Sequence, residues 1–501
     1  MRFLPLCVLL LLLVLFSGGC APAGLPSPEA MLAEIEEQAI NMLGADSANT
    51  GELFAWQANW RAERFLEAYE ATGDPGYIAA ATSYFNRLLE KTHTSPDGYR
   101  GWVGPYIYDN TYHTDAHIAD AILTAHMLAI AERILVREPE TLASYTADAR
   151  GYVAFARRDV IEKWAVRGTW FVDGPYGYWV TWPMMFIGED RTERVETHTL
   201  HDRLGYQWNK QTEMARIALF LYRITGDTTY REIAARLGRL FKSRLALHEG
   251  HYTWNYWEPV YEGDIASFEG KKLVHWVGTH PHRHYQIKEV NFVAEAFHTG
   301  LVFDEEDIRR FVRTHDEVMW NGSFRRPQWR NSDAAIIEAV RGSYEPPQPA
   351  SPHLEHFYRG RPWPPLADFS ENIRRLSGLP AGGPVSFERH HARNVEVFPL
   401  PDPASAHIRM AAPIPAQVGQ GEPLHALIAT WTSGPYTLEI LDGAGQRILR
   451  ALAAEEVGEG LVGIEIIDTG DLVPGRFFLR WTLPSGEARR LPFWVVAPGA
   501  D

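Results

Sequence analysis

A short motif that occurs twice in the chain restricts the possible fold more than any other feature. The pattern Tyr-x-x-Thr-Gly-Asp-x-x-Tyr covers residues 69–77 and recurs at residues 222–230. Glycine readily takes the left-handed conformation that ends a helix, and aspartate caps the first turn of the next helix. Each copy therefore predicts a tight corner between two helices. Thr299-Gly300, followed by Asp304, is a weaker third copy.

Long amphipathic stretches surround these corners. Between about residues 30 and 331 they alternate with loops rich in glycine, proline and aromatic residues, and strand signals are scarce there. Helical hairpins that repeat every several tens of residues indicate an array that closes on itself or stacks as a solenoid. We therefore expect a mainly α domain over residues 21–380.

The pattern changes after a segment rich in proline and glycine at about residues 346–384. Beyond it, residues 436–441, 462–467 and 476–483 alternate apolar and polar side chains between turn residues, as half-buried strands do. We expect residues 381–501 to form a small antiparallel β-sandwich. This domain either binds carbohydrate or only braces the helical domain, because its sequence contains no ligand motif that decides between them.

The N-terminus has the features of an export signal. Met1 and Arg2 precede an apolar run at residues 8–16 that is too short to span a bilayer. The run ends in Ser-Gly-Gly-Cys at residues 17–20, which resembles a bacterial lipoprotein processing site, although an aliphatic residue is commoner in place of the serine. We expect residues 1–20 to be a signal peptide and Cys20 to carry a lipid. The protein would then be exported and anchored in the bacterial cell envelope, on the periplasmic or surface face of the outer membrane; the alternative is a soluble secreted protein.

Cysteine content and charge limit the partners. Cys7 lies inside the signal and Cys20 is the other cysteine, so the mature chain cannot form an internal disulfide. No later stretch approaches about 18 consecutive apolar residues, so we expect membrane contact only through the lipid. The net charge of -15 and the lack of a basic block argue against a nucleic-acid partner. An acidic polymer remains compatible, because a cleft can be locally positive.

The Tyr-x-x-Thr-Gly-Asp corner between paired helices resembles that of α/α-toroid carbohydrate-active enzymes, which include polysaccharide lyases, glycoside hydrolases and sugar epimerases. The resemblance covers about residues 30–380 and is more specific for fold than for reaction. It implies an (α/α) toroid whose inner helices point their N-termini toward one mouth, where the substrate lies. Tetratricopeptide arrays and glycan-binding outer-membrane lipoproteins also contain helical hairpins, so a non-catalytic glycan-binding lipoprotein is one alternative.

Residues that can do chemistry gather where the inner helices are expected to begin. Counting back from each Thr-Gly pair places Trp56, Asn59, Trp208 and Asn209 near helix starts. Three loops that contain histidine also precede predicted inner helices. They are residues 108–113 with Asn110 and His113, residues 198–203 with His201, and residues 279–285 with His282, Arg283, His284 and Tyr285.

These residue types suit β-elimination of a uronic-acid polymer. The C5 proton becomes acidic once the neighbouring carboxylate is neutralised by hydrogen bonds or positive charge, and a tyrosine or histidine can then remove it. The resemblance to lyases implies Tyr285 as base, with Arg283 favouring its phenolate. It also implies His284 or His282 and His201 as partners, and Asn110 or Asn209 as the group that neutralises the carboxylate.

Aromatic residues concentrate in the predicted loops, as expected of a glycan cleft, because sugar rings stack on aromatic faces. Packing in the core explains any one of them equally well. The candidates for substrate binding are His113, Tyr176, Tyr178, Trp179, Trp208, Trp254, Trp257 and Glu258.

Other reactions remain open. Hydrolysis needs two carboxylates about 5–10 Å apart, and candidates for it are Asp109, Asp202, Glu213, Glu258 and Glu262. An extended His280-x-His282-x-His284 could bind a divalent metal, although Pro281 disfavours that geometry and we expect no cofactor. A sugar epimerase would share the C5 proton abstraction. We favour a lyase acting on an acidic polysaccharide, with a glycoside hydrolase as runner-up.

Overall fold

The structure is a computed structural model in which most of the chain can be described. The described residues are 26–43, 52–59, 62–95, 97–106, 109–115, 117–181, 185–187, 193–195, 205–248, 250–254, 286–330, 357, 360–379, 396–397, 408–414, 417–430, 434–452, 456–457, 462–482 and 488–497. The signal and Cys20 lie outside them, as does the expected domain boundary at residues 380 and 381. Within these ranges no helix combines the length and the apolar character needed to cross a membrane.

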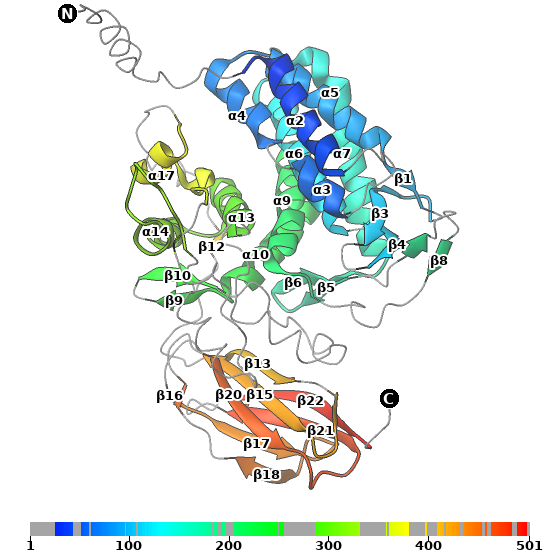
Figure 1. The fold of residues 1–501 in the computed structure, drawn as a ribbon, viewed down its shortest axis with the longest axis vertical. Coiled ribbons are helices and arrows are strands. Elements are labelled where there is room, and N and C mark those ends of the chain that lie inside the picture. The colour runs from blue at the N-terminus through cyan, green and yellow to red at the C-terminus, as the bar shows by residue number, and fades with distance from the viewer. Residues whose placement is uncertain are drawn as a thin grey trace, which may run out of the picture.

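The N-terminal part consists mainly of paired helices (Figure 1). Four of them lie side by side in chain order, each contacting the next. We call them the central row: α3 (Glu52–Asn59), α6 (His117–Glu132), α9 (Trp208–Thr225) and α13 (Gln286–Thr299). Further helices pack outside this row: α2 (Pro28–Leu43), α4 (Glu63–Thr72), α5 (Gly76–Glu90), α7 (Thr146–Phe155), α8 (Lys163–Val166), α10 (Thr228–Lys242) and α14 (Glu305–Arg313).

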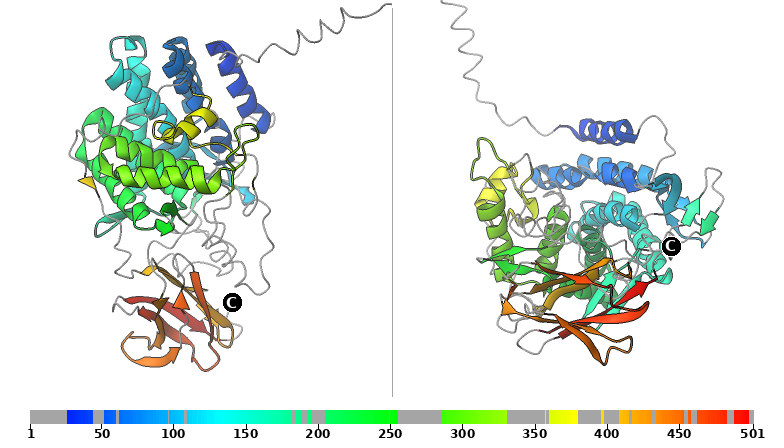
Figure 2. Two further views of the ribbon diagram at one scale, coloured as in Figure 1. Left: turned by 90° about the vertical axis from the view of Figure 1, so that its left-hand side faces the viewer. Right: turned by 60° about the horizontal axis from the view of Figure 1, so that its bottom comes forward.

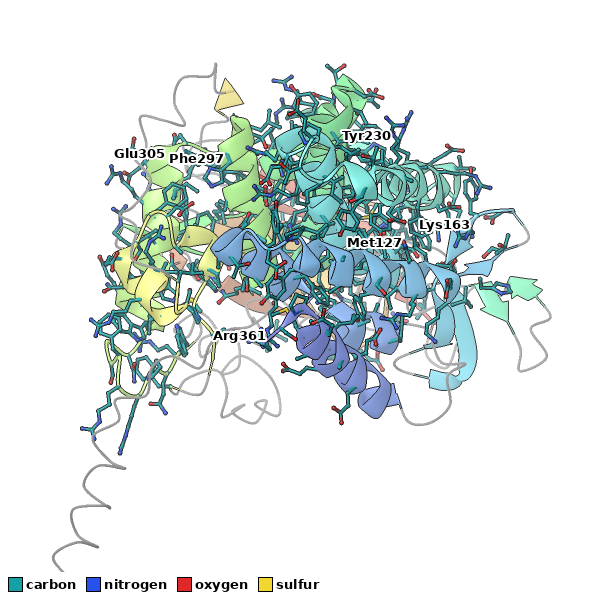
Figure 3. All side chains as sticks on the ribbon, turned by 90° about the horizontal axis from the view of Figure 1, so that it is seen from above. Met127, Lys163, Tyr230, Phe297, Glu305 and Arg361 are labelled. Atoms are coloured by element: carbon teal, nitrogen blue, oxygen red, sulfur yellow. The ribbon has the colours of Figure 1, made fainter. Side chains whose placement is uncertain are left out.

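Burial explains why the central row holds together. Nearly every side chain of α6 is buried, and Met127 in its middle is fully enclosed (Figure 3). A helix that is buried on all sides needs neighbours around its whole circumference. The outer helix α10 is amphipathic instead and turns residues such as Leu237 and Phe241 toward α9. One continuous core therefore joins the central row to the outer helices.

The three predicted corners are confirmed. Gly73, Gly226 and Gly300 all have positive φ angles, of 69°, 75° and 76°. In the first two corners, the glycine N–H donates to the carbonyl of the motif tyrosine, at 2.7 and 2.8 Å. Asp227 caps α10 by accepting a bond from the Thr229 N–H, whereas Asp74, two residues before α5, accepts one from the N–H of Gly76, the first residue of that helix. Local backbone chemistry thus sets these turns, as the motif predicts.

The loops between the hairpins contain more strand than we expected. They form short antiparallel pairs, because runs of only two to seven residues are too short to show a strand period in the sequence. The strands are β1 (His93–Thr94) with β2 (Arg100–Gly101), β5 (Trp170–Asp173) with β6 (Tyr176–Trp179), β9 (Ala246–His248) with β10 (His251–Thr253), and a four-stranded sheet of β3 (Val103–Tyr106), β4 (Asp109–Asp115), β7 (Met185–Ile187) and β8 (Glu193–Val195).

The C-terminal part is a smaller β region, as predicted (Figure 2). One sheet has the order β13-β15-β20 and the other the order β14-β22-β21-β17-β18. Side chains from both sheets share one core around Trp481 and Phe493. The pairing is not purely antiparallel, because β14 runs parallel to β22. The bounds are β13 (Ile408–Ile414), β14 (Gln417–Gly419), β15 (Pro423–Thr430), β17 (Thr437–Leu441), β18 (Ile448–Leu452), β20 (Val462–Asp468), β21 (Gly475–Thr482) and β22 (Ala488–Val496).

The corner glycines give a direct test of the helix turns. A Cβ at Gly226 would meet no atom within 4 Å, so the Gly226→Ala change acts only through the positive φ. We expect Gly226→Ala to lower the free energy of unfolding by about 1–2 kcal/mol. At Gly151, inside α7, an added Cβ would also meet no atom within 4 Å. Gly151→Ala should therefore raise stability by about 0.5–1 kcal/mol. Urea unfolding of both variants measures this, and changes of the same sign would contradict it.

Candidate functional site

Many of the candidate residues lie outside the described part of the chain. They are Cys20, His201, Trp257, Glu258, His282, Arg283, His284 and Tyr285, together with Asp202, Glu262 and His280 of the alternative reactions. Asn110 and His113 belong to β4, whose backbone is described but whose side chains at these positions are not. In β4, His113 is paired with Ile187 of β7. The roles of all these residues remain predictions.

The candidate aromatics that the structure describes lie mostly in the core. Trp179, Trp208 and Trp254 are at most 1% exposed. The Trp208 ring packs on Phe241, and Trp254 packs edge-on against the same ring, with centroids 5.4 and 6.0 Å away. As placed, these rings cannot stack on a sugar. The physical reason is that Trp208 packs on Phe241 of the outer helix α10, and that the β6 strand carrying Trp179 packs on the same helix.

The β5–β6 ribbon shows the same behaviour. Tyr178 is buried and stacks on Phe171, with the ring planes 6° apart. Trp170 packs on Trp179 at 4.8 Å. Tyr176 is half-buried, and of the candidates in this ribbon it is the one that a ligand could reach.

A buried polar cluster connects all four helices of the central row. It consists of Asn59, His126, Glu213, Arg216 and Lys288, and each is at most 8% exposed. The Oδ1 atom of Asn59 accepts from Lys288 at 3.3 Å and lies 2.5 Å from Nε2 of His126. Glu213 in turn forms ion pairs with Lys288 at 3.1 Å and Arg216 at 3.0 Å. We call this the central polar cluster.

The central polar cluster changes the interpretation of Glu213, a hydrolase candidate. Two buried cations hold its carboxylate, so it is placed as a counter-ion rather than as an acid free to protonate a leaving group. The pKa of His126 is well below its usual value, because burial disfavours the charged ring and Lys288 and Arg216 repel it. The imidazole is therefore neutral and can donate from Nε2 to Asn59.

A second group lies at the start of α9, next to the start of α6. We call it the α9-start cluster: His117, Tyr206, Asn209 and Lys210. The His117 ring stacks on the Tyr206 ring at 4.6 Å with 18° between the planes. The Lys210 ammonium lies 5.7 Å from the centre of the same tyrosine ring. The Tyr206 backbone is fixed by Trp179 O, which accepts from its N–H at 3.2 Å.

Two members of this cluster have spare hydrogen-bonding capacity. Asn209 is fully buried, and among the described residues neither atom of its amide has a partner. His117 is 1% exposed, and both of its ring nitrogens likewise lack a partner there. An unsatisfied buried polar group costs about 1–3 kcal/mol and often marks a functional site. Tyr206 and Lys210 are half-buried, so they remain within reach of a ligand.

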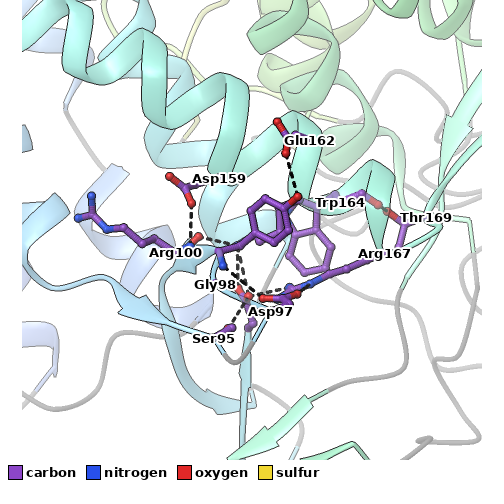
Figure 4. A network of polar contacts seen from close by, with 12 residues as sticks. Ser95, Asp97, Gly98, Arg100, Asp159, Glu162, Trp164, Arg167 and Thr169 are labelled. Carbon is purple, nitrogen blue, oxygen red and sulfur yellow. Dashed lines mark hydrogen bonds and ion pairs between the residues drawn. The ribbon is translucent and has the colours of Figure 1, made fainter.

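A charge cluster beneath the β3–β4 hairpin fixes the segment that carries Asn110 and His113. Lys163 binds Asp115 at 3.1 Å and Asp120 at 2.6 Å, and Arg167 binds Asp115 at 2.7 Å. Figure 4 shows Arg167 and Trp164 with their surroundings. Burial alone would raise the pKa of Asp115, but the nearby charges of Lys163 and Arg167 outweigh burial and lower that pKa. Burial raises the pKa of Asp120 to about 7.

Gly101 lies directly against this charge cluster. A Cβ at this position would come within 2.5 Å of Lys163 Nζ and 2.6 Å of Asp115 Oδ1, so no larger residue fits without moving the ion pairs. Sequence reasoning missed both the charge cluster and Tyr206. The charged partners are up to 52 residues apart, and no local pattern indicates that they meet.

Known proteins give no further guide to the site. The chain matches no protein-family model and no curated protein at a significant level. Within the described ranges, no group of three or more His, Cys, Asp or Glu side chains is placed to hold a metal ion.

Removing the Asn209 amide provides a test of its unsatisfied state. Asn209→Leu keeps the shape and deletes the unpaired polar atoms, so we expect the free energy of unfolding to rise by about 1 kcal/mol or more. Asn86→Leu is the matched control. Its amide donates to Asp148 and accepts from Tyr152, both at 2.9 Å, so this change should destabilise the protein. Urea unfolding measures both, and a clear loss of stability in Asn209→Leu would contradict the assignment.

The buried His117 ring predicts a pH dependence of stability. Its pKa is well below the usual value, because burial disfavours the charged ring and Lys163 and Lys210 repel it. Below about pH 6.5 the unfolded chain binds a proton that the folded chain excludes. The free energy of unfolding therefore decreases as the pH is lowered, by up to about 1.4 kcal/mol per pH unit. His117→Phe keeps an aromatic ring at this position but removes the titratable group, so it should flatten this slope between pH 7 and 5. Urea unfolding at several pH values tests it, and parallel slopes would contradict it.

Proposed function

We propose that the protein is a polysaccharide lyase that cleaves a uronic-acid-containing polysaccharide by β-elimination. The alternation of the central row with outer helices supports an (α/α) toroid as its helical fold. In such a fold the loops before α6, α9 and α13 gather at one mouth. The predicted histidine clusters occupy those loops, and the substrate would bind there.

The observation that carries this proposal is the amide of Asn209 in the first turn of α9, which has no partner among the described residues. Its N–H donors can bond to a uronate carboxylate and delocalise the charge that develops when the C5 proton leaves. Lys210, the next residue, adds a positive charge in the same turn. Neutralising the carboxylate is the most demanding requirement of the reaction, and this turn supplies both kinds of group for it.

The chemical step balances without a cofactor. A base removes the C5 proton, the C5–H electron pair forms the C4–C5 double bond, and the C4–O bond breaks. The leaving oxygen then takes a proton from an acid. We assign the base to Tyr285 with Arg283, and the acid and orienting groups to His284 or His282 and His201. Asn110 and Asn209 are assigned to the substrate carboxylate.

The remaining assignments follow the sequence. The acidic polysaccharide is the expected partner, nucleic acid is not, and a lipid on Cys20 would hold the exported protein at the membrane. The C-terminal β region would bind glycan or brace the helical part.

Ultraviolet absorbance tests the function directly. The protein without residues 1–20 is incubated with a panel of uronic-acid polymers. Absorbance reports the reaction because the new double bond conjugates with the carboxylate. We expect the absorbance to rise, and we expect a chelator to leave the rate of this rise unchanged. In Tyr285→Phe the rate should be lower by about 100-fold or more.

Each other outcome identifies a different function. Reducing sugars without absorbance would indicate hydrolysis, and retention of intact glycan without cleavage would indicate a binding lipoprotein. Loss of activity with a chelator would indicate a metal site involving His280, His282 and His284. A fully active Tyr285→Phe would remove the role of that tyrosine.

A further inference from the structure

The outer face of the five-stranded sheet in the C-terminal β region contains a group of arginines, although the whole chain has a net charge of -15. Alternate side chains of β21 enter the core, as Leu479 does, so the side chains between them lie on the outer face. The outer residues of β21 include Arg476, Phe478 and Arg480. In the sheet, β21 lies between β22 and β17, so both neighbours add side chains to this face (Figure 1).

The register of the sheet brings like charges together on this face. Arg490 of β22 lies opposite Arg480, and Trp494 lies opposite Arg476. Residues directly opposite in an antiparallel pair point to the same face, and like charges in such a pair are destabilising. Glu439 of β17 offsets one charge, because it pairs with Arg480 at 2.6 Å. Arg476 and Arg490 are both exposed, and among the described residues neither forms an ion pair.

Hydrogen bonds and a shared ring hold these two arginines in place. Arg476 donates from Nε and Nη2 to the carbonyl of Gly443, at 3.1 and 2.8 Å. Arg490 donates from Nη1 to the carbonyl of Gly445 at 3.0 Å. Both guanidinium groups also lie 5.3 Å from the centre of the Phe478 ring. A guanidinium has five N–H donors, so each arginine is fixed by a part of its donors and keeps the others for a ligand.

We call Arg476, Phe478, Arg480 and Arg490 the arginine platform, and we propose that it binds the carboxylate or sulfate ester groups of an acidic sugar chain. Guanidinium suits such oxyanions, because its donors form a rigid fork that matches their oxygens. Strand residues are about 3.3 Å apart, so Arg476 and Arg480 are separated by about 13 Å along β21. The positive charges are therefore spread along a sheet face, as an extended polyanion requires.

The arginine platform favours a glycan over a nucleic acid. Single-stranded nucleic acid binds mainly through bases that stack on aromatic rings, whereas Phe478 is half-buried and has two guanidinium groups over its ring. The net charge of -15 also opposes a partner as densely charged as nucleic acid. The inference rests on the proposed function only in taking the ligand to be a glycan. It assigns binding, rather than bracing alone, to the C-terminal β region.

Binding by the protein without residues 1–20 tests the platform. Calorimetry measures the affinity for three glycans: an oligouronate, its carboxyl-reduced neutral form, and that neutral form carrying sulfate esters. We expect Arg476→Met combined with Arg490→Met to weaken binding of the anionic glycans about tenfold or more and to make its salt dependence shallower. Arg476→Lys combined with Arg490→Lys keeps both charges and should restore part of the affinity. The control, Lys91→Met with Arg150→Met, removes two exposed charges from the helical part and should change affinity by less than about twofold.

A local measurement shows whether the glycan binds at these arginines. Phenylglyoxal modifies arginine side chains, and peptide mass analysis follows each one in the unaltered protein. We expect an anionic glycan to slow modification of Arg476 and Arg490, and the neutral form to leave it unchanged. Equal modification with and without the anionic glycan would overturn the proposal, even if a methionine variant failed to fold. Thermal unfolding shows which variants are folded.

The remaining outcomes separate the arginine platform from the proposed reaction. If both anionic glycans bind and the neutral form does not, the platform accepts either oxyanion; binding of one alone identifies the source. Wild-type affinity in the double methionine variant would overturn the proposal, as would tighter binding of a single-stranded oligonucleotide or of phosphatidylglycerol vesicles. If no polymer is cleaved but the double methionine variant still loses affinity, the lyase proposal fails and the arginine platform stands.

Discussion

The contact on which the rest of the helical part depends is the buried pairing of Lys288 with Glu213 and Asn59. It joins α13 to α9 and α3, and His126 adds α6 through the same asparagine. Removing one partner from a buried ion pair leaves an uncompensated charge and is strongly destabilising. Because every partner comes from a different helix, the network also fixes the register of the central row.

The two polar clusters therefore have different characters. The central polar cluster pairs Glu213 with Lys288 and Arg216, so it behaves mainly as structure, although Arg216 Nε has no partner among the described residues. The α9-start cluster leaves an amide and an imidazole unsatisfied among the described residues. Natural proteins tolerate such local costs mainly where function requires them. This contrast, rather than the number of polar residues, separates scaffold from candidate site.

Sequence reasoning placed the helix starts better than it placed individual side chains. It placed Asn59, Trp208 and Asn209 near the starts of the first helices of their hairpins, and Asn209 and Trp208 do open α9. Asn59 instead closes α3 and enters the central polar cluster. Trp179, Trp208 and Trp254 proved to be core residues, because aromatic content does not reveal which way a ring faces. Tyr206 was missed, since only its contacts with His117 and Lys210 distinguish it from other tyrosines.

The sequence by itself determined the helical corners and the change to strands, because both are local. A glycine with positive φ and an aspartate cap act within a few residues, and strand alternation repeats every two. Tertiary structure alone decided the polar clusters. His126 and Asn59 are 67 residues apart, and Lys288 and Asn59 are 229 apart. No local pattern specifies such pairs, because burial and charge compensation depend on which helices come to lie side by side.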